Sequence, residues 1–327
     1  MAAFTRFKRE QLERYLIMFS KGDLVEYEVI ATGIENTNYF VTIDEPGGQR
    51  EYVLTILEGL DFGEPAYFNE LMTHLRNYGL PVAPPEKTLD GMTTTIFCGK
   101  PTILSRRLPG SHPDANRNEP SIIQCRSIGK ALAEIHESNP RLNKKRDNPY
   151  NLDWIRDTLD RLIELSDQDR MLAKAIADDY AAFFSSSVAQ TLPKAIVHAD
   201  LFPDNTLFEG DQLTGLLDFY HACTDFCVED LAITLNAWCR KQDAAFDEDR
   251  LDALVSAYQS VRSLTPDEIS VLPLMLCSGA LRFFLTRHLS KEGQADYLKD
   301  PNEFRLIMQK ETESSSAAIL EKICNGR

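Results

Sequence analysis

One stretch of the sequence decides the fold: Ile196-Val197-His198-Ala199-Asp200-Leu201-Phe202-Pro203-Asp204-Asn205. An apolar run ends at His198, Asp200 follows it, and Asn205 stands five positions after Asp200. The next residues have a hairpin pattern, with a turn at Glu209-Gly210-Asp211, and lead directly into Asp218. Such a hairpin would place the polar side chains at its two ends, those of Asn205 and Asp218, on adjacent turns.

These side chains suit phosphoryl transfer to an alcohol. That reaction needs a carboxylate aimed at the acceptor hydroxyl and oxygen ligands for magnesium. A single Asp in a loop is more often a turn former, but the whole ordered set favours chemistry. We predict Asp200 as the catalytic base and Asn205 with Asp218 as Mg²⁺ ligands. His198 belongs to the catalytic loop, where we expect it to hold the loop by hydrogen bonds. Asp204 is either a carboxylate beside the site or a turn residue.

Composition and charge limit the function. A chain of 327 residues is long for one core and indicates two lobes. The content of 43% hydrophobic and 26% charged residues is ordinary for a soluble enzyme. The formal charge of −15 argues against binding to nucleic acid or to an anionic membrane, because a phosphate-reading surface needs a basic patch. We therefore expect a small-molecule substrate.

Cysteine spacing and hydropathy predict a cytoplasmic protein. The seven cysteines contain no Cys-x2-Cys pair, which is typical of reduced thiols and makes a zinc site unexpected. Residues Met1 to Phe19 mix charged and apolar positions, so we expect a surface helix there and no signal peptide. The most apolar stretch, Ile269 to Leu281, is interrupted by Pro273 and is expected to be too short to span a bilayer.

The predicted fold class is α+β with two lobes. Residues 1–107 would form a small antiparallel sheet with one main helix, and residues 108–327 a larger, mostly helical lobe. The small lobe is predicted from strand patterns at Leu24–Ile34, Thr37–Ile43, Glu51–Leu57, Thr93–Phe97 and Thr102–Ser105, and from helical spacing of Phe68, Leu71, Met72 and Leu75. The first lobe would bind nucleotide, and the second would carry the catalytic and substrate-binding residues.

Local signals mark the hinge and two helices of the larger lobe. Pro109 to Pro120 is rich in turn residues and is the expected hinge. Apolar residues recur at helical spacing from Ser121 to Glu137. Thr265-Pro266-Asp267-Glu268 combines a capping box with Pro at the first helical position, which predicts a helix start.

A turn between the first two strands is the predicted phosphate contact. It reads Gly33-Ile34-Glu35-Asn36-Thr37-Asn38-Tyr39-Phe40, with no P-loop and no Gly-x-Gly-x2-Gly anywhere in the chain. Backbone amides and Asn side chains there could lie over nucleotide phosphates. The residues predicted to bind ATP are Gly33, Asn36, Thr37 and Asn38, together with Ser105 and Arg106 through their backbone at the lobe junction.

One expected kinase residue is absent. Kinases usually carry a lysine on the third strand to hold the α- and β-phosphates, and here that strand has Thr55. Either the protein no longer transfers phosphate, or magnesium and the Asn-rich turn replace the lost charge. The intact Asp200, Asn205 and Asp218 favour the second explanation.

With these residues in place, the chain resembles the aminoglycoside phosphotransferase and choline kinase superfamily, whose members carry a His-x-Asp-x4-Asn loop followed by an Asp on the next strand. More narrowly, it is similar to the homoserine kinases of that protein-kinase-like fold. The likeness runs over nearly the full length. It rests on Gly33–Phe40, Val53-Leu54-Thr55, His198–Asn205, Leu217–Cys223, Asp230–Cys239 and Leu281–Arg287. Thr55 is then a feature of this branch.

The resemblance implies ATP-dependent phosphorylation of the side-chain hydroxyl of L-homoserine, on the route to threonine. Ala237, where an acidic residue is more familiar, departs from the pattern. A related kinase acting on choline, an aminoglycoside or a sugar remains an alternative, as does a nucleotide-binding pseudokinase.

Several further residues are candidates for the acceptor pocket or for its support. The candidates for contact with the substrate are Asp204, Tyr220, Asn236, Trp238 and Arg282. For Trp238, core packing is the favoured alternative. Arg282 and Arg287 lie on one apolar helix, and either could meet a substrate carboxylate or pair with a core carboxylate. Asp230 is expected to be a helix N-cap or an anchor of the catalytic loop, and His136 a hydrogen-bonded core histidine.

Overall fold

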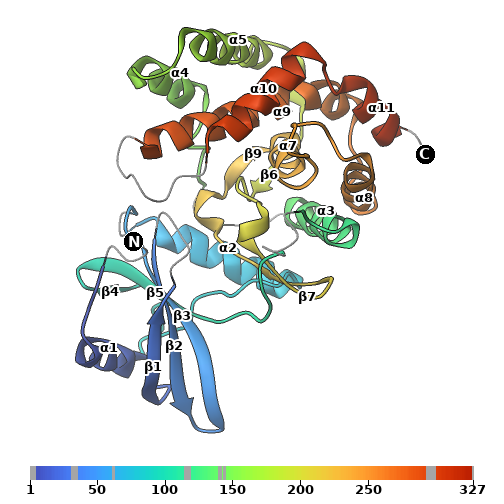
Figure 1. The fold of residues 1–327 in the computed structure, drawn as a ribbon. Coiled ribbons are helices and arrows are strands. Elements are labelled where there is room, and N and C mark those ends of the chain that lie inside the picture. The colour runs from blue at the N-terminus through green and yellow to red at the C-terminus, as the bar shows by residue number, and fades with distance from the viewer. Residues whose placement is uncertain are drawn as a thin grey trace. The chain divides into compact units, whose positions relative to one another are not determined.

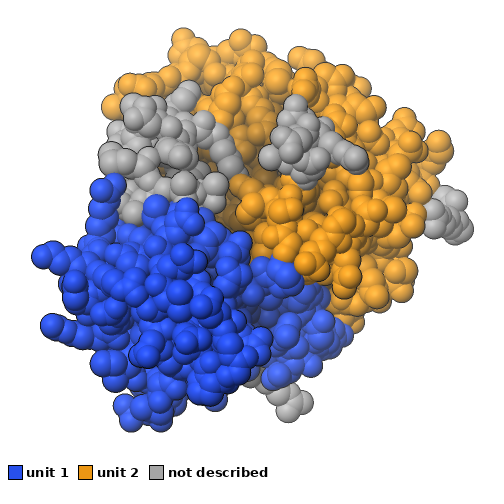
Figure 2. Space-filling view, turned by 60° about the horizontal axis from the view of Figure 1, so that its bottom comes forward, with its two compact units in different colours: residues 1–109, 141–144 blue, residues 110–140, 145–327 orange. Residues whose placement is uncertain are grey.

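The computed structural model describes residues 5–30, 36–60, 63–113, 119–138, 142, 145–291 and 300–325. The chain divides into two compact units, residues 1–109 with 141–144 and residues 110–140 with 145–327, coloured separately in Figure 2. The first boundary lies two residues beyond the predicted one.

The N-terminal unit contains one antiparallel sheet of five strands in the order β1-β2-β3-β5-β4 (Figure 1). The sequence of three strands, one helix and two strands is confirmed, and residues 31–34, the end of the first predicted strand, lie outside the described residues. Its elements are α1 (Arg9–Leu16), η1 (Ile17–Phe19), β1 (Asp23–Val29), β2 (Thr37–Glu45), β3 (Gly48–Ile56), α2 (Pro65–Tyr78), β4 (Thr95–Phe97) and β5 (Lys100–Arg106).

The strands of this sheet present alternating side chains to two faces. On β2, Tyr39, Val41 and Ile43 are buried in a cluster that includes Leu12 and Leu16 of α1. The helix predicted at the N-terminus therefore covers one face of the sheet with an amphipathic surface. Because side chains alternate along a strand, the residues directly before and after these positions, such as Asn38 and Phe40, point to the opposite face.

The C-terminal unit is mostly helical, as predicted, and holds two small antiparallel pairs, β6 with β9 and β7 with β8. Its helices are α3 (Ile122–Glu137), α4 (Leu152–Arg161), α5 (Asp167–Phe184), α6 (Val188–Thr191), α7 (Cys227–Trp238), α8 (Glu248–Gln259), α9 (Pro266–Lys291), α10 (Asn302–Glu313) and α11 (Ala317–Asn325). The remaining elements are β6 (Lys194–Val197), η2 (Pro203–Asn205), β7 (Thr206–Glu209), β8 (Gln212–Leu216), η3 (Phe219–His221) and β9 (Cys223–Phe226).

Two close packings fix the helices beside the catalytic hairpin. Helix α7 is buried along almost its whole length, and α9 runs across it in Figure 1. Helices α3 and α8 approach at Gly129, where an added Cβ would lie only 2.1 Å from the carbonyl oxygen of Leu254. Any larger side chain at Gly129 would push the two helices apart.

Helix α9 corrects one sequence expectation. The helix continues through Pro273, and its segment Pro266–Leu289 is long and apolar enough to cross a membrane by length and composition. Leu272, Met275 and Leu276 are fully buried in the unit, as expected for a core helix. An internal proline costs a helix about 3 kcal/mol, and burial of these neighbours offsets that cost. The capping box at Thr265 and Glu268 is confirmed by reciprocal bonds of 3.2 and 2.9 Å.

Candidate active site

The catalytic loop, His198–Asn205, connects β6 to the β7–β8 hairpin and is closed by its own hydrogen bonds. The Asn205 Nδ2 group donates to both the carbonyl and the Oδ2 atom of Asp200, each at 2.8 Å. The amide of Leu217 donates to the carbonyl of Asn205 at 2.9 Å. Asp218 therefore follows a residue that is hydrogen-bonded to Asn205, and the three predicted residues come together as the hairpin pattern indicated.

The oxygens at this site fit a hard divalent cation. Because the amide nitrogen of Asn205 bonds to Asp200, its Oδ1 atom is directed away from that contact. Asp218 ends the hairpin with left-handed backbone angles of φ 59° and ψ 59°. In the parts of the chain that the structure describes, no group of three or more His, Cys, Asp or Glu side chains could hold a metal. One carboxylate with one amide oxygen leaves most coordination positions to phosphate and water, as Mg²⁺ prefers.

His198 holds the loop and is fully buried. Its Nε2 atom donates to the carbonyl of Leu217 at 3.0 Å, and its Nδ1 atom accepts from the amide of Asp200 at 3.3 Å. Burial is the main cause that lowers the pKa of His198, against the raising effects of Asp230 and Asp200. A neutral ring with both nitrogens engaged is a structural link between the two arms of the site, as expected, and not a base.

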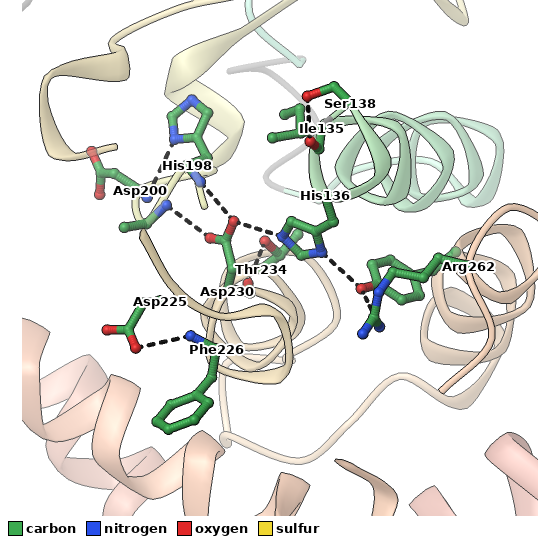
Figure 3. Close-up of polar contacts among 12 residues, drawn as sticks. Ile135, His136, Ser138, His198, Asp200, Asp225, Phe226, Asp230, Thr234 and Arg262 are labelled. Atoms are coloured by element: carbon green, nitrogen blue, oxygen red, sulfur yellow. Dashed lines mark hydrogen bonds and ion pairs between the residues drawn. The ribbon is translucent and has the colours of Figure 1, made fainter. Parts of the chain in front are cut away.

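Asp230, on the first turn of α7, anchors the loop from beneath (Figure 3). Its two oxygens accept the backbone N–H groups of His198 at 2.7 Å and Ala199 at 2.8 Å, and Oδ2 also contacts His136 Nε2 at 3.1 Å. Burial alone would raise the pKa of Asp230, but the bond from His136 and the N–H donors bring that pKa below its usual value. The anchor role is therefore confirmed, and so is the hydrogen-bonded core role of His136.

Ala199 is held from both sides in a strained conformation. Its φ of 63° lies in the left-handed region, which costs a non-glycine residue about 1 kcal/mol. Asp230 binds its N–H group, and Arg282 Nη1 donates to its carbonyl oxygen. These two contacts fix the peptide groups on both sides of Ala199, and thus the direction in which the carboxylate of Asp200 leaves the loop.

Arg282 is a buried cation with few hydrogen bonds. The side chain is 3% exposed, its guanidinium lies 4.1 Å from the ring centre of Tyr150 and 4.6 Å from that of Phe283, and Nε has no hydrogen-bond partner among the described residues. Arg287, the other arginine of this helix, instead pairs with Glu303 at 2.7 Å. Of these two arginines, Arg282 is the one that contacts Ala199, the residue directly before Asp200.

The other predicted substrate residues differ in their surroundings. Trp238 is fully buried and donates through Nε1 to the carbonyl of Leu201 at 2.8 Å, which is the packing role. Asn236 bridges helices, because Nδ2 donates to Leu276 and Oδ1 accepts from Arg240. Asn236 also lines a cavity of about 540 Å³ that reaches Pro203. Asp204 is exposed on η2, and Tyr220 is half-buried on η3.

One buried carboxyl near the loop had no signal in the sequence. Glu229 precedes Asp230 on α7, is 6% exposed, and accepts a hydrogen bond from the hydroxyl of Tyr180 at 2.9 Å. Burial, followed by the charge of Asp225, raises the pKa of Glu229 to about 8, and Arg282 opposes that shift. Tyr180 reaches this carboxyl from α5, 49 residues away along the chain, so no local pattern predicts the contact.

Of the phosphate-turn candidates in the N-terminal unit, Gly33 lies outside the described residues. Asn36 Oδ1 accepts from the amide of Glu58 at 3.2 Å, and Asn38 Oδ1 accepts from Thr55 Oγ1 at 2.7 Å. Thr37 is fully buried and its hydroxyl donates to Glu58 at 2.6 Å, so this side chain points to the α1 face. The side chains of Asn38 and Thr55 both point to the other face of the sheet.

Two further features concern the predicted adenine contacts and the missing lysine. Ser105 Oγ is buried without a hydrogen-bond partner among the described residues, whereas the Arg106 side chain bonds to Glu86. Lys100 makes an ion pair with Glu58, the residue that also binds Thr37. Lys100 therefore lies on the side of Thr37, opposite to Thr55, and does not stand in for a third-strand lysine.

The fold and this loop define the class of phosphotransferases with a kinase-like arrangement. Residues 26–264 match the model of the phosphotransferase enzyme family (APH), and the chain belongs to that family. It is 35% identical to the homoserine kinase of Cupriavidus taiwanensis over 97% of both chains, and 35% identical to that of Rhizobium meliloti over 93% and 92% of the two chains.

Solved structures show the same fold at low identity. An amicoumacin kinase, determined with AMP-PNP, Ca²⁺ and amicoumacin, superposes with a TM-score of 0.70 at 13% identity, over 98% of this chain and 94% of that one. A microcompartment-associated aminopropanol kinase superposes with a TM-score of 0.66 at 15% identity, over 98% of both chains. The α+β, protein-kinase-like fold class predicted from the sequence is thereby confirmed.

Proposed function

We propose that this protein transfers the γ-phosphoryl group of ATP to the side-chain hydroxyl of L-homoserine, giving ADP and O-phospho-L-homoserine for threonine biosynthesis in the cytoplasm. Near-full-length identity to several homoserine kinases supports the substrate. The observation that carries the chemistry is the hydrogen-bonded pair of Asp200 and Asn205 beside Asp218.

In this mechanism Asp200 orients the acceptor hydroxyl and takes its proton. The hydroxyl oxygen forms a bond to the γ-phosphorus as the bond from that phosphorus to the β–γ bridging oxygen breaks, and ADP leaves with the electron pair. Asn205 fixes the carboxylate through Oδ2. Preorganisation of this kind supplies most of the rate in phosphoryl transfer, because little covalent chemistry is left to the protein.

Asn205 and Asp218 are the residues that would hold Mg²⁺, and the bound ion would neutralise charge on the phosphates. Among the nucleotide contacts, we assign Asn36, Asn38 and the backbone of Thr37 to the phosphates. The Ser105–Arg106 backbone, and the buried Ser105 hydroxyl, we assign to adenine.

The pair of Thr55 and Asn38 explains how the site works without a third-strand lysine. Thr55 Oγ1 donates to Asn38 Oδ1, so the two N–H groups of Asn38 Nδ2 are directed outwards from that bond. Those groups are donors without charge for a phosphate oxygen. The turn thus offers hydrogen bonds where other kinases offer a cation, and a Mg²⁺ ion held by Asn205 and Asp218 would supply the charge compensation.

For the acceptor, we assign the substrate carboxylate to Arg282. A guanidinium close to the rings of Tyr150 and Phe283, with one hydrogen bond to the loop, keeps donors for a planar bidentate ligand. Asp204, Tyr220 and Asn236 remain candidates for other contacts of the substrate.

Initial rates of ADP release test this proposal. The acceptors are L-homoserine, 3-aminopropan-1-ol, which lacks the carboxylate, 4-hydroxybutyrate, which lacks the ammonium group, choline, kanamycin, and buffer alone. We expect turnover that strongly favours L-homoserine. Preference for choline or kanamycin would support the phosphotransferase activity but contradict the assignment of L-homoserine as the acceptor. Tight ATP binding without turnover on any acceptor would indicate a pseudokinase.

A further inference from the structure

A chain of buried polar groups continues from the catalytic loop into the helices of the C-terminal unit (Figure 3). His136 Nε2 lies 3.1 Å from Asp230 Oδ2, and His136 Nδ1 lies 2.7 Å from the hydroxyl of Tyr258. Arg262 Nη1 donates to that same hydroxyl at 3.0 Å, and Nη2 binds Glu268 at 2.8 Å. The proposed chemistry uses none of the four residues beyond Asp230 in this chain.

The chemistry of the groups decides the donor in several of these bonds. Arginine can only donate, so the oxygen of Tyr258 accepts from Arg262, and the same hydroxyl contacts His136 Nδ1. A lowered pKa keeps Asp230 ionised, so its carboxylate accepts from His136 Nε2 and from the backbone N–H groups of the catalytic loop. His136 and Tyr258 therefore each make two contacts within the chain of polar groups.

The helices that carry the chain are held at a fixed spacing. His136 and Tyr258 lie further along α3 and α8 than Gly129 and Leu254, which bring the two helices into contact. The side chains of His136 and Asp230 are fully enclosed, and Tyr258 and Glu268 are fully buried. A buried network in which each link is satisfied is rigid, since breaking any link leaves a polar group without a partner.

We propose that His136 and Tyr258 are positioning residues for phosphoryl transfer. Together with Arg262 they fix the carboxylate of Asp230, and through it the peptide that aims Asp200. The effect on turnover rests on the proposed function, whereas the effect on the loop does not. The residues that aim Asp200 are then contributed by α3 and α8, which lie outside the loop and the hairpin.

The test is a Tyr258→Phe variant, which removes only the hydroxyl. We expect kcat with L-homoserine to fall about ten-fold or more while the KM for ATP stays within about two-fold, because a small misplacement of a reacting group is costly. Backbone amide hydrogen exchange at His198 and Ala199 should accelerate about ten-fold. His136→Gln, which keeps an N–H donor for Asp230, should retain more kcat than His136→Ala.

The matched control is Tyr15→Phe in the N-terminal unit, which also loses one buried hydroxyl contact, to Thr95 at 2.6 Å. It should leave both kcat and the exchange at His198 unchanged. An unchanged kcat in Tyr258→Phe, or an equal fall in Tyr15→Phe, would overturn the proposal. If wild-type protein shows no turnover with L-homoserine, the proposed substrate fails, and the exchange rates at His198 and Ala199 alone decide whether the chain positions the loop.

Discussion

The catalytic loop of the C-terminal unit and the phosphate turn of the N-terminal unit, Asn36–Asn38, are held in different ways. Buried side chains from α7 and α9 reach the loop, where Asp230 binds the N–H group of Ala199 and Arg282 binds its carbonyl oxygen. The turn depends on its own sheet: Thr37 pairs with Ile56, Asn38 pairs with Thr55, and Glu58 binds Asn36.

This difference indicates which of the two segments has to be rigid. A base for phosphoryl transfer must be aimed within a fraction of an ångström, and the loop of Asp200, which we propose as the base, is fixed by charge-assisted hydrogen bonds in a buried site. The phosphates of a nucleotide can be met by neutral donors on a hairpin. We therefore expect substitutions at the loop to change turnover and substitutions at the turn to change nucleotide affinity.

The largest expected effect is at Asp200. Asp200→Ala should lower kcat by about 10³-fold, as loss of a base does, and leave the Kd for ATP nearly unchanged. Steady-state rates and calorimetric titration with ATP and Mg²⁺ measure the two quantities. Glu209→Ala, an exposed position on the same hairpin, is the control. Near-normal turnover in Asp200→Ala would refute the assignment of the base.

The next effect is at Asp218, the proposed metal ligand. Asp218→Ala should lose on the order of 100-fold in ATP affinity measured with Mg²⁺, because a coordinating carboxylate is removed. Chelation of the metal should weaken ATP binding to the wild-type protein by a similar factor and change the variant little. Equal ATP affinity of the two proteins in Mg²⁺ would show that Asp218 does not bind the ion.

A smaller effect is expected at Arg282. The ratio of kcat/KM for L-homoserine to that for 3-aminopropan-1-ol should fall about 10- to 100-fold in Arg282→Met. A factor of this size is what the loss of charge-assisted hydrogen bonds to the substrate carboxylate would cause. Arg287→Met, five positions along α9 and paired with Glu303, is the matched control and should keep the ratio. A ratio that falls in Arg287→Met and is kept in Arg282→Met would assign the substrate carboxylate to Arg287 instead.

The smallest effect is at the turn. Thr55→Val removes the bond that orients Asn38 and should raise the KM for ATP about 2- to 10-fold, since one neutral hydrogen bond contributes about 0.5–1.5 kcal/mol. Thr102→Val, a buried threonine on β5, is the control. A large fall in kcat with unchanged KM would mean that the turn, like the loop, sets the geometry of transfer.

The outcome for particular residues shows what local pattern can predict. The strands, the capping box at Thr265 and the closeness of Asp200, Asn205 and Asp218 followed from spacing and were confirmed by the structure. Pro273 was misjudged, because the burial that stabilises α9 around it depends on the neighbouring helices. The position of Lys100 relative to Thr55 depends on which strand face each occupies, and that follows from the sheet register.

The sequence by itself determined the order of elements, the residue types of the site and the class of chemistry, because turns, caps and apolar periodicity act over a few residues. Only the tertiary structure decided which side chains hold the loop. His136 and Asp230 are 94 residues apart, and Ala199 and Arg282 are 83 apart. A buried polar group takes the partner that packing brings to it, and no local spacing encodes that choice.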